Sequence, residues 1–218
     1  MAGKFDGFGP LQTSPLRDQV YTALRQRISN GLFPDTGVVE QELSETLQVS
    51  RTPVREALFQ LCREGVLVKR GRGYHLPPLS PEERSQISEV REVLDPLMVR
   101  LALKRSGATI LERLRPAYIA EQAAHRAGDT RAFVQAHAEF RAALRDGARN
   151  DRLAQIIELL DDQIIRQRMI THAIPENRDH TLRTHARIIA AAETGEPEHG
   201  AEAMEELMRF AQVYLNSC

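Results

Sequence analysis

Apolar residues recur at helical spacing over most of this 218-residue chain. A first stripe recurs every four residues and consists of Leu16, Val20, Leu24 and Ile28. Gly31 follows it, where a helix often ends on a left-handed residue. A second short helix is predicted within residues 39–49. A third is predicted over residues 50–65, with an inward face of Val54, Ala57, Leu58 and Leu61.

The stretch VLVKRGRGYHL, residues 66–76, departs from this helical pattern. Its β-forming residues flank Gly71-Arg72-Gly73, which predicts two short strands joined as a hairpin. Three helices followed by such a hairpin are the layout of a winged helix-turn-helix, whose later helix enters the major groove of DNA. We assign this domain, the head, to residues 12–76, and we expect residues 1–11 to be disordered.

Residues 77–80 contain two prolines and predict a short, stiff linker. Ser80, Pro81 and Glu83 then form the signature of a capping box that starts a helix. Residues 81–218, the body, show only helical periodicity, with breaks at Ser106-Gly107, Gly128-Asp129, Gly147 to Asn150, His172 to Pro175 and Gly195 to Pro197. The expected fold class is therefore mainly α, a winged head followed by an all-α bundle of six helices.

The chain is nearly neutral, with 29 Lys and Arg against 30 Asp and Glu. Residues 1–79 hold 10 basic and 8 acidic residues, and residues 80–218 hold 19 and 22. A mildly basic head is consistent with nucleic-acid binding. Cys62 and Cys218 do not resemble a disulfide framework and favour a reducing compartment. No apolar run approaches ~18 residues, so we expect a cytoplasmic protein without a membrane partner.

Candidate DNA contacts gather at the start of the third helix and in the hairpin. Arg51 and Arg55 stand four residues apart and project together, and their guanidinium forks suit guanine edges or phosphates. Ser50, Thr52 and the helix N-terminus add neutral donors for phosphate. In the hairpin, a wing would meet DNA through Lys69, Arg70 and Arg72. Taken alone, exposed arginines are more often solvated charge than base readers.

The run LSETLQVSRTPVREALFQLCREGVLVKRGRGYHL closely resembles the DNA-binding head of the GntR transcription regulators. The segment SRTPVREAL and the spaced "L..EG" and "RG.G" elements carry the resemblance, which spans about residues 12–79. It implies that DNA is contacted by Arg51, Thr52, Arg55 and the wing-tip pair Arg70-Gly71. A further family contact, often an arginine, falls on Gln41, which can hydrogen-bond a base or phosphate but carries no charge.

The body resembles the C-terminal ligand domain of the FadR subfamily, often called FCD, over nearly all of residues 80–218. The segment EVREVLDPLMVRLAL is similar to the family's opening helix and places Arg91 where an arginine faces the effector cavity. Many members also bind a metal ion through an Asp-x-x-Phe-His segment and two later histidines. Alignment on Phe140 and Asn150 assigns those four positions to His137, Arg141, His185 and Leu207. Arginine has no lone pair to give and leucine has no donor atom, so the implied ligand set is incomplete.

We interpret this site as an anion pocket in which the charge of Arg141 replaces that of the metal. Arg91 and Arg141, with His137 and His185 beside them, would hold a small carboxylate or phosphate effector, and no cofactor is expected. Two alternatives stay open. One is a residual transition-metal site on His137 and His185, and the other is a degenerate pocket in which Arg141 only pairs with an acidic neighbour.

Most other polar residues of the body are expected at the surface. This applies to the histidines His125, His172, His180 and His199. It also applies to the arginines Arg166, Arg168, Arg178, Arg183 and Arg187, of which Arg166 is the best candidate to reach the cavity.

Together these features predict a ligand-responsive, sequence-specific transcription regulator, expected to act as a repressor. A homodimer would present two heads to a palindromic double-stranded DNA site. The alternatives are a metal-dependent sensor and a ligand-independent DNA-binding protein. Enzyme activity is not expected, because the sequence has no nucleophile with a base, no paired carboxylates and no phosphate-cradling glycine loop.

Overall fold

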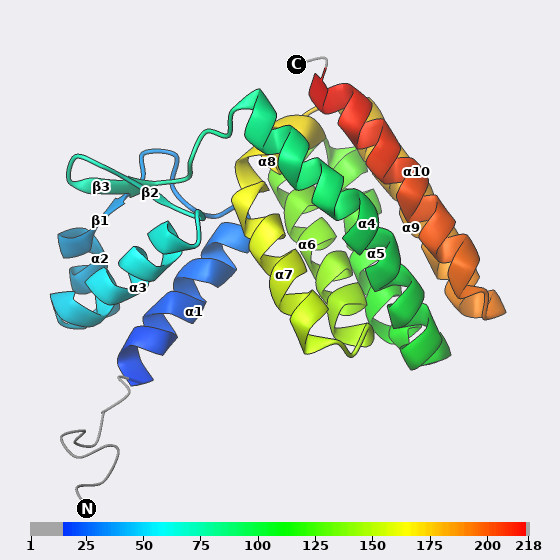
Figure 1. Ribbon diagram of the computed structural model, residues 1–218, viewed down its shortest axis with the longest axis horizontal. Helices are drawn as coiled ribbons and strands as arrows, with labels where there is room; N and C mark the ends of the chain where they lie inside the picture. The colour runs from blue at the N-terminus through cyan, green and yellow to red at the C-terminus, as the bar shows by residue number, and fades with distance from the viewer. Residues whose placement is uncertain (1–14, 217–218) are drawn as a thin grey trace, which may run out of the picture.

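The computed structural model describes residues 15–216, which form a head and a body (Figure 1). The predicted disorder of residues 1–11 and the position of Cys218 lie outside the described residues. The head consists of α1 (Pro15–Ser29), β1 (Val38–Val39), α2 (Glu40–Leu47), α3 (Arg51–Arg63), β2 (Val68–Arg70) and β3 (Gly73–His75). The predicted winged helix-turn-helix is therefore confirmed.

The wing is a three-stranded antiparallel sheet with the order β1-β3-β2. Arg70 pairs with Gly73, so the hairpin turn consists of Gly71 and Arg72. Gly71 has a φ of +58°, which glycine adopts without steric cost. On the other side of β3, Val38 pairs with Tyr74. This third strand was not predicted, because two residues are too few to show an alternating pattern.

The head core is built mainly from the predicted inward faces. The buried cluster includes Val20, Leu24 and Ile28 of α1, Val54, Leu58 and Leu61 of α3, and Tyr74 of β3. Leu16, the first member of the predicted stripe, is 38% exposed instead, since it lies in the first turn of α1. Val134 and Ile165 of the body are buried in the same cluster, so the head and body share part of a core.

The described part of the body contains seven α-helices and one 3-10 turn. They are α4 (Pro81–Ser106), η1 (Gly107–Ile110), α5 (Leu111–Ala127), α6 (Thr130–Gly147), α7 (Asp151–Gln163), α8 (Ile165–His172), α9 (Pro175–Thr194) and α10 (Pro197–Asn216). The predicted helical segment between Asn150 and His172 is divided at Ile164 into α7 and α8. None of the described helices is long and apolar enough to cross a membrane.

The helix ends follow from local sequence signals. Ser80 and Glu83 form the predicted capping box, in which each side chain accepts a hydrogen bond from the other residue's backbone N–H. Asn150 caps α7 by accepting from the backbone N–H of Leu153. Gly128 and Gly195 end α5 and α9 in the left-handed conformation. These caps fix where each body helix begins or stops.

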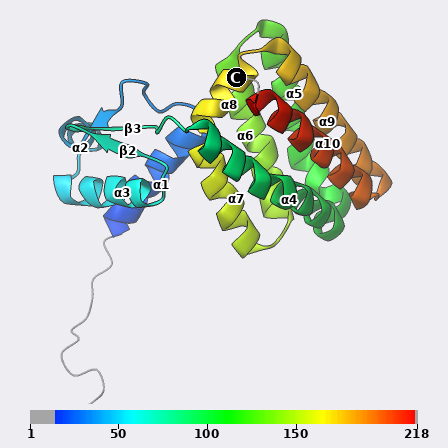
Figure 2. The ribbon, with the colours of Figure 1, turned by 45° about the horizontal axis from the view of Figure 1, so that its top comes forward.

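In the body, α10 packs along α4 and α9, and α5 packs against α6 and α9 (Figure 2). The apolar core includes Met98, Phe140, Ile188 and Met204. Polar side chains are buried beside it, among them Asp95, Glu121, His137, Arg141, Asp161, Arg168, His172 and His185. Burying such groups costs free energy unless they are paired, so this interior is where a functional site is to be sought.

Candidate functional site

The start of α3 presents polar side chains to solvent. Ser50 precedes the helix in an extended conformation, and its side chain does not cap the helix. Arg51, Thr52 and Arg55 are exposed, whereas Pro53 and Val54 face the core. This end of α3 therefore offers hydroxyl and guanidinium donors to a phosphate or a base edge.

Glu40 at the start of α2 connects α3 to the wing. Its carboxylate accepts from Nε of Arg55 at 3.1 Å and from the hydroxyl of Tyr74 at 2.8 Å. Burial would raise the pKa of Glu40, but these two hydrogen bonds outweigh burial and lower the pKa. The ion pair holds Nε of the Arg55 guanidinium, while the side chain stays 64% exposed. Next to it, Gln41 is exposed and donates to Glu45 at 3.0 Å.

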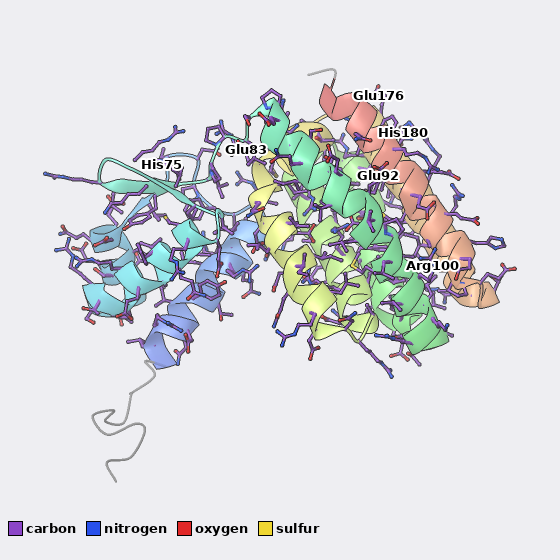
Figure 3. All side chains as sticks on the ribbon, viewed as in Figure 1. His75, Glu83, Glu92, Arg100, Glu176 and His180 are labelled. Carbon is purple, nitrogen blue, oxygen red and sulfur yellow. The ribbon has the colours of Figure 1, made fainter. Side chains whose placement is uncertain are left out.

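The wing tip is also open to solvent. Lys69 lies over the ring of Tyr74, 5.3 Å from its centroid. His75, labelled in Figure 3, packs so closely on Gly37 that a Cβ there would lie 2.5 Å from its Nδ1. All nine predicted DNA contacts are exposed on the head: Gln41, Ser50, Arg51, Thr52, Arg55, Lys69, Arg70, Gly71 and Arg72.

A cavity of about 90 Å³ lies inside the body, lined by α4, α6, α8, α9 and α10. Its apolar wall comes from α10, with Met204, Leu207 and Met208, and the other helices supply Arg84, Arg91, His137, Arg141, Arg168 and His172. Three of the four predicted effector residues, Arg91, His137 and Arg141, therefore line one cavity. His185 is buried and does not line the cavity. Its ring stacks on that of His137, with the centroids 5.2 Å apart.

Arg141 is held in an ion-pair network. Its Nε donates to Asp161 at 2.9 and 3.0 Å, and its two Nη atoms donate to Asp95 at 3.0 and 3.1 Å. Burial would lower the pKa of Arg141, but the charges of Asp161 and Asp95 outweigh it and raise the pKa. The charge of Arg141 is therefore already matched by acidic neighbours, the pairing that the degenerate-pocket alternative assumes. A role of Arg141 in effector binding stays a prediction.

Two further arginines donate hydrogen bonds in this network, and Arg145 lies 3.6 Å from Asp161. Arg91 donates to Asp95 at 2.7 Å, and Arg168 donates to Asp161 at 2.7 Å. The predicted surface position of Arg168 is wrong, because the side chain is buried, and burial lowers its pKa to about 10. Arg178 is buried as well and donates to the backbone oxygen of His172. Arg166 is exposed and does not line the cavity.

Arg84 differs from the other cavity arginines. Among the described residues no carboxylate lies within salt-bridge distance of it, and its Nη1 donates to Gln167 at 3.4 Å. The Nε atoms of Arg84 and Arg91 are buried without a hydrogen-bond partner. A buried donor without an acceptor is costly, so these two N–H groups provide places for an anion.

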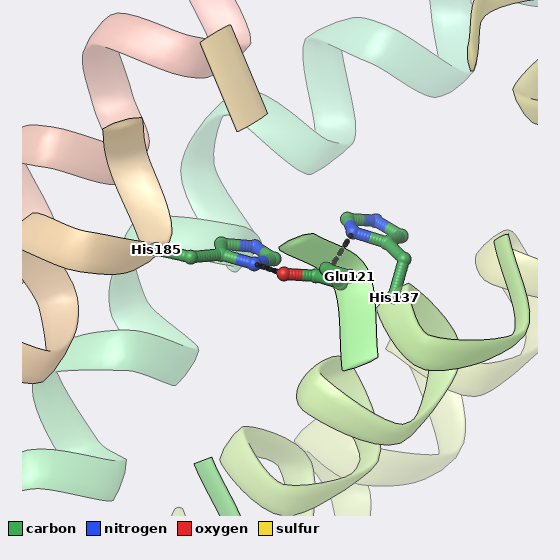
Figure 4. A group of neighbouring side chains, drawn as sticks. All are labelled: Glu121, His137 and His185. Atoms are coloured by element: carbon green, nitrogen blue, oxygen red, sulfur yellow. Dashed lines mark hydrogen bonds and ion pairs between the residues drawn. The ribbon is translucent and has the colours of Figure 1, made fainter. Parts of the chain in front are cut away.

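Glu121 of α5 lies between His137 and His185 (Figure 4). Its carboxylate oxygens are 3.3 Å from Nδ1 of His137 and 2.8 Å from Nδ1 of His185. Burial lowers the pKa of His137 well below its ordinary value, and the charge of Arg168 lowers it further. His137 is therefore a neutral imidazole that donates its Nδ1–H to Glu121 and keeps a lone pair on Nε2.

The donor atoms of Glu121, His137 and His185 lie within 4.8 Å of one another, as in many metal sites. The charges around the cluster disfavour a metal ion, although Nε2 of His185, buried without a partner while Nδ1 contacts Glu121, would be free to bind one. The charges of Arg168 and Arg141, which lower the pKa of His137, would repel a cation. The cluster is better described as a carboxylate that orients two imidazoles.

His172 was predicted to be solvated, and this is wrong. It is buried, its ring centroid lies 5.1 Å from that of His137, and its Nδ1 lies 2.9 Å from the backbone oxygen of Arg168. Burial lowers the pKa of His172 to about 3. Its neutral ring therefore forms part of the cavity lining beside His137.

Sequence reasoning missed the acidic residues and two of the arginines of this site: Asp95, Glu121, Asp161, Arg84 and Arg168. A signal existed for Glu121, which continues the buried stripe of Leu114, Ala117 and Ala124 on α5. An acid on a core-facing stripe needs a partner inside the fold. Its position could therefore have marked it as a member of a buried site.

Comparison with known proteins agrees with this geometry. Residues 16–75 match the family described as "Bacterial regulatory proteins, gntR family", and residues 86–210 match the FCD domain. "Uncharacterized HTH-type transcriptional regulator YdhC" of Bacillus subtilis is 28% identical, with 84% of this chain and 83% of that protein covered. "Probable D-xylose utilization operon transcriptional repressor" of Paenarthrobacter nicotinovorans is 27% identical, with 89% and 86% covered.

The solved structure of Escherichia coli McbR/YncC superposes on 94% of this chain and 99% of its own, with a TM-score of 0.80 and 24% identity. That likeness extends over both the head and the body. Two family matches together span the head and most of the body. The winged fold and the exposed arginines on α3 and the wing agree with these matches. The chain belongs to the GntR family of DNA-binding transcription regulators, and its body is an FCD domain.

Proposed function

We propose that this regulator is a repressor whose affinity for a palindromic DNA site is set by a small anionic metabolite bound in the body. The observation that carries the proposal is the buried cavity with unsatisfied arginine N–H groups on Arg84 and Arg91. An anion there would complete both hydrogen-bonding groups and match the charge of Arg84. The repressor role is supported by the name of the Paenarthrobacter relative.

The cavity also bears on the class of effector. Its lining combines arginines with the apolar side chains of Met204, Leu207 and Met208 on α10. This pairing suits a small carboxylate with a short apolar body better than inorganic phosphate. Drug-sized ligands usually occupy roughly 300–1,000 Å³. A cavity of about 90 Å³ therefore fits only a small acid, unless side chains of α10 move.

DNA recognition is assigned to the nine exposed head residues. Arg51 and Arg55 would enter the major groove with the start of α3, while Lys69, Arg70 and Arg72 of the wing meet the backbone or minor groove. Two heads in a homodimer would contact two half-sites, which is the reason for expecting a palindrome. A repressor of chromosomal genes works in the cytoplasm, where its DNA is.

Thermal denaturation with a panel of acids tests the effector site. The probes are acetate, butyrate, benzoate and inorganic phosphate. A binding acid at about 100 times its Kd adds about 2.7 kcal/mol of stability, which raises the Tm by roughly 5 to 10 °C for a chain of this size. The Arg84→Ala variant should lose the shift. Arg166→Ala, an exposed arginine on α8, is the matched control and should keep it.

Operator binding is then measured with and without the acid that shifts the Tm, on a site selected from genomic fragments. A repressor that is released by its effector should bind this site more weakly in the presence of the acid. Operator affinity that no acid changes would leave a ligand-independent DNA-binding protein. An equal shift in the Arg84→Ala and Arg166→Ala variants would place the acid elsewhere.

A further inference from the structure

The last three residues of α7 contact three different parts of the molecule. Successive side chains on a helix are about 100° apart, so Asp161, Asp162 and Gln163 point in separate directions. We call them the coupling segment. Directly after it, the helix breaks at Ile164, and α8 begins at Ile165. In both ribbon views, α7 and α8 are the body helices nearest to α1 (Figures 1 and 2).

Asp161 faces the cavity network. It accepts from Arg141 at 2.9 Å and from Arg168 at 2.7 Å, and both of these arginines line the cavity. Burial alone would raise the pKa of Asp161, but the charges of Arg141 and Arg168 outweigh it and hold the pKa far below its ordinary value. Asp161 is therefore the link between α7 and the arginines of the cavity.

Asp162 faces the head. Its Oδ2 accepts from Nε and Nη2 of Arg25 on α1, at 2.7 and 2.5 Å. Arg25 also donates to the hydroxyl of Tyr21 at 3.3 Å, and that hydroxyl donates to Glu64 at 2.7 Å. Glu64 is the C-cap residue of α3. A continuous chain of polar contacts thus runs from α7 through α1 to the end of the helix that carries Arg51 and Arg55.

Gln163 makes a second and shorter connection to the same place. Its Nε2 donates to the backbone oxygen of Glu64 at 2.8 Å. The fit is close, because a Cβ at Gly65 would lie 3.2 Å from that Nε2. One residue further on, Ile164 lines the cavity, and Ile165 is buried in the head core. Within residues 161–165, less than two helical turns, some side chains contact the cavity or its network and the others contact the head.

The contact with α1 is less well satisfied than the contacts of Arg141. Oδ1 of Asp162 is buried without a partner, whereas Arg141 uses each of its guanidinium nitrogens. Burial raises the pKa of Asp162 to about 6, against the opposing effect of Arg25. A small displacement at the end of α7 would therefore affect the head contact before it affected the network around Arg141.

We propose that the coupling segment transmits occupancy of the cavity to the position of α3. An anion that pairs with Arg168 competes with Asp161 for that arginine, which leaves the end of α7 held by Arg141 and less tightly fixed than before. Asp162 and Gln163 move with it, and their contacts to α1 and to the C-cap of α3 change. This inference rests on the proposed function, in that occupancy of the cavity alters DNA binding.

Hydrogen exchange of the full chain tests the coupling without an effector. Asp161→Asn weakens the pairing with Arg168, and Asp161 makes no hydrogen bond or ion pair to a described residue of the head. We expect amides around residues 60–67 and 21–28 to exchange about five- to tenfold faster than in the unsubstituted protein, in the usual range of coupling between sites. The matched control is Asp146→Asn, which removes an exposed aspartate paired with Arg113 and should leave these rates unchanged.

A double-substitution cycle provides the second readout. Gln163→Ala removes the direct contact to Glu64 and leaves the cavity network intact. In operator affinity, the effects of Asp161→Asn and Gln163→Ala should combine non-additively, because both act through the same displacement. If Asp161→Asn does not fold, Arg168→Gln replaces it, since Arg141 still neutralises Asp161 in that variant.

Head exchange rates equal to those of the unsubstituted protein, with additive effects on operator affinity, would overturn the coupling. Failure of every acid in the panel to bind would instead refute the proposed effector site. The exchange test uses no acid, so the two failures are distinguishable.

Discussion

The arginine residues of the head and of the body differ in exposure and in pairing. In the head, Arg51, Arg55, Arg70 and Arg72 are exposed, and only Arg55 pairs with an acid. In the body, Arg141 and Arg168 are buried and pair with aspartates. An exposed guanidinium is available to DNA and contributes little to folding, whereas a buried one holds helices together. The exposed arginines of the head are therefore the ones we propose for recognition, whereas the buried pair Arg141 and Arg168 stabilises the fold.

The largest effect should come from breaking the body network. Arg141→Ala leaves Asp95 with Arg91 alone and Asp161 with Arg168 and the more distant Arg145, and we expect a loss of about 3 to 5 kcal/mol in the free energy of unfolding. Chemical denaturation followed by circular dichroism measures this. Arg113→Ala removes an exposed arginine on α5 and should change stability by less than about 1 kcal/mol. Similar losses in both variants would contradict the distinction between buried and exposed arginines.

The next effect concerns pH. His172 has a pKa of about 3 in the fold and an ordinary value of 6.5, so the unfolded chain binds more protons between these limits. Above pH 6.5, the low pKa of His172 has no effect on the stability of the fold. As the pH falls from 6.5 toward 3, protonation of His172 in the unfolded chain destabilises the fold increasingly. In His172→Gln, the loss of stability between pH 7 and pH 4 should be smaller by roughly 2 to 3 kcal/mol. Denaturation at several pH values measures it, and parallel curves would refute the buried neutral state of His172.

A smaller effect is expected in the head, on DNA binding rather than on folding. Arg51→Ala should cost about 1 to 3 kcal/mol in operator affinity and leave the unfolding curve nearly unchanged. Fluorescence anisotropy over a salt series separates two contact types. A lost phosphate contact lowers the salt slope by about one, and a lost base contact relaxes sequence preference. Arg100→Ala, on the body surface, is the control, and an equal loss there would rule out a specific contact by Arg51.

The smallest effect is expected from metal removal. Because Glu121 already accepts from both imidazoles and Arg141 and Arg168 lie nearby, chelation should leave the Tm unchanged. Elemental analysis of protein purified without added metal gives a second measurement. Zinc at one equivalent per chain, lost in Glu121→Gln, would contradict the description of this cluster as an orienting carboxylate.

The sequence predicted much of the fold, because helical periodicity, glycine breaks and capping residues are local signals. It also predicted which head residues are exposed, since the motif fixes their place on α3 and the wing. The body site was predicted only in part. Arg141 and Asp95 are 46 positions apart, and no local pattern links them. Asp161 continues a stripe begun by Leu153 and Ile157, so its burial could have been predicted in the same way as that of Glu121.

The ion pairs of Arg141 also restrict how this protein can evolve. In relatives that use a metal, the position of Arg141 is expected to hold a histidine ligand. A single Arg141→His substitution here would deprive Asp95 and Asp161 of their shared cation. The intermediate would lose stability before any metal could bind, and Leu207 would still provide no donor. A metal site at these four positions would therefore require several coordinated substitutions in this chain.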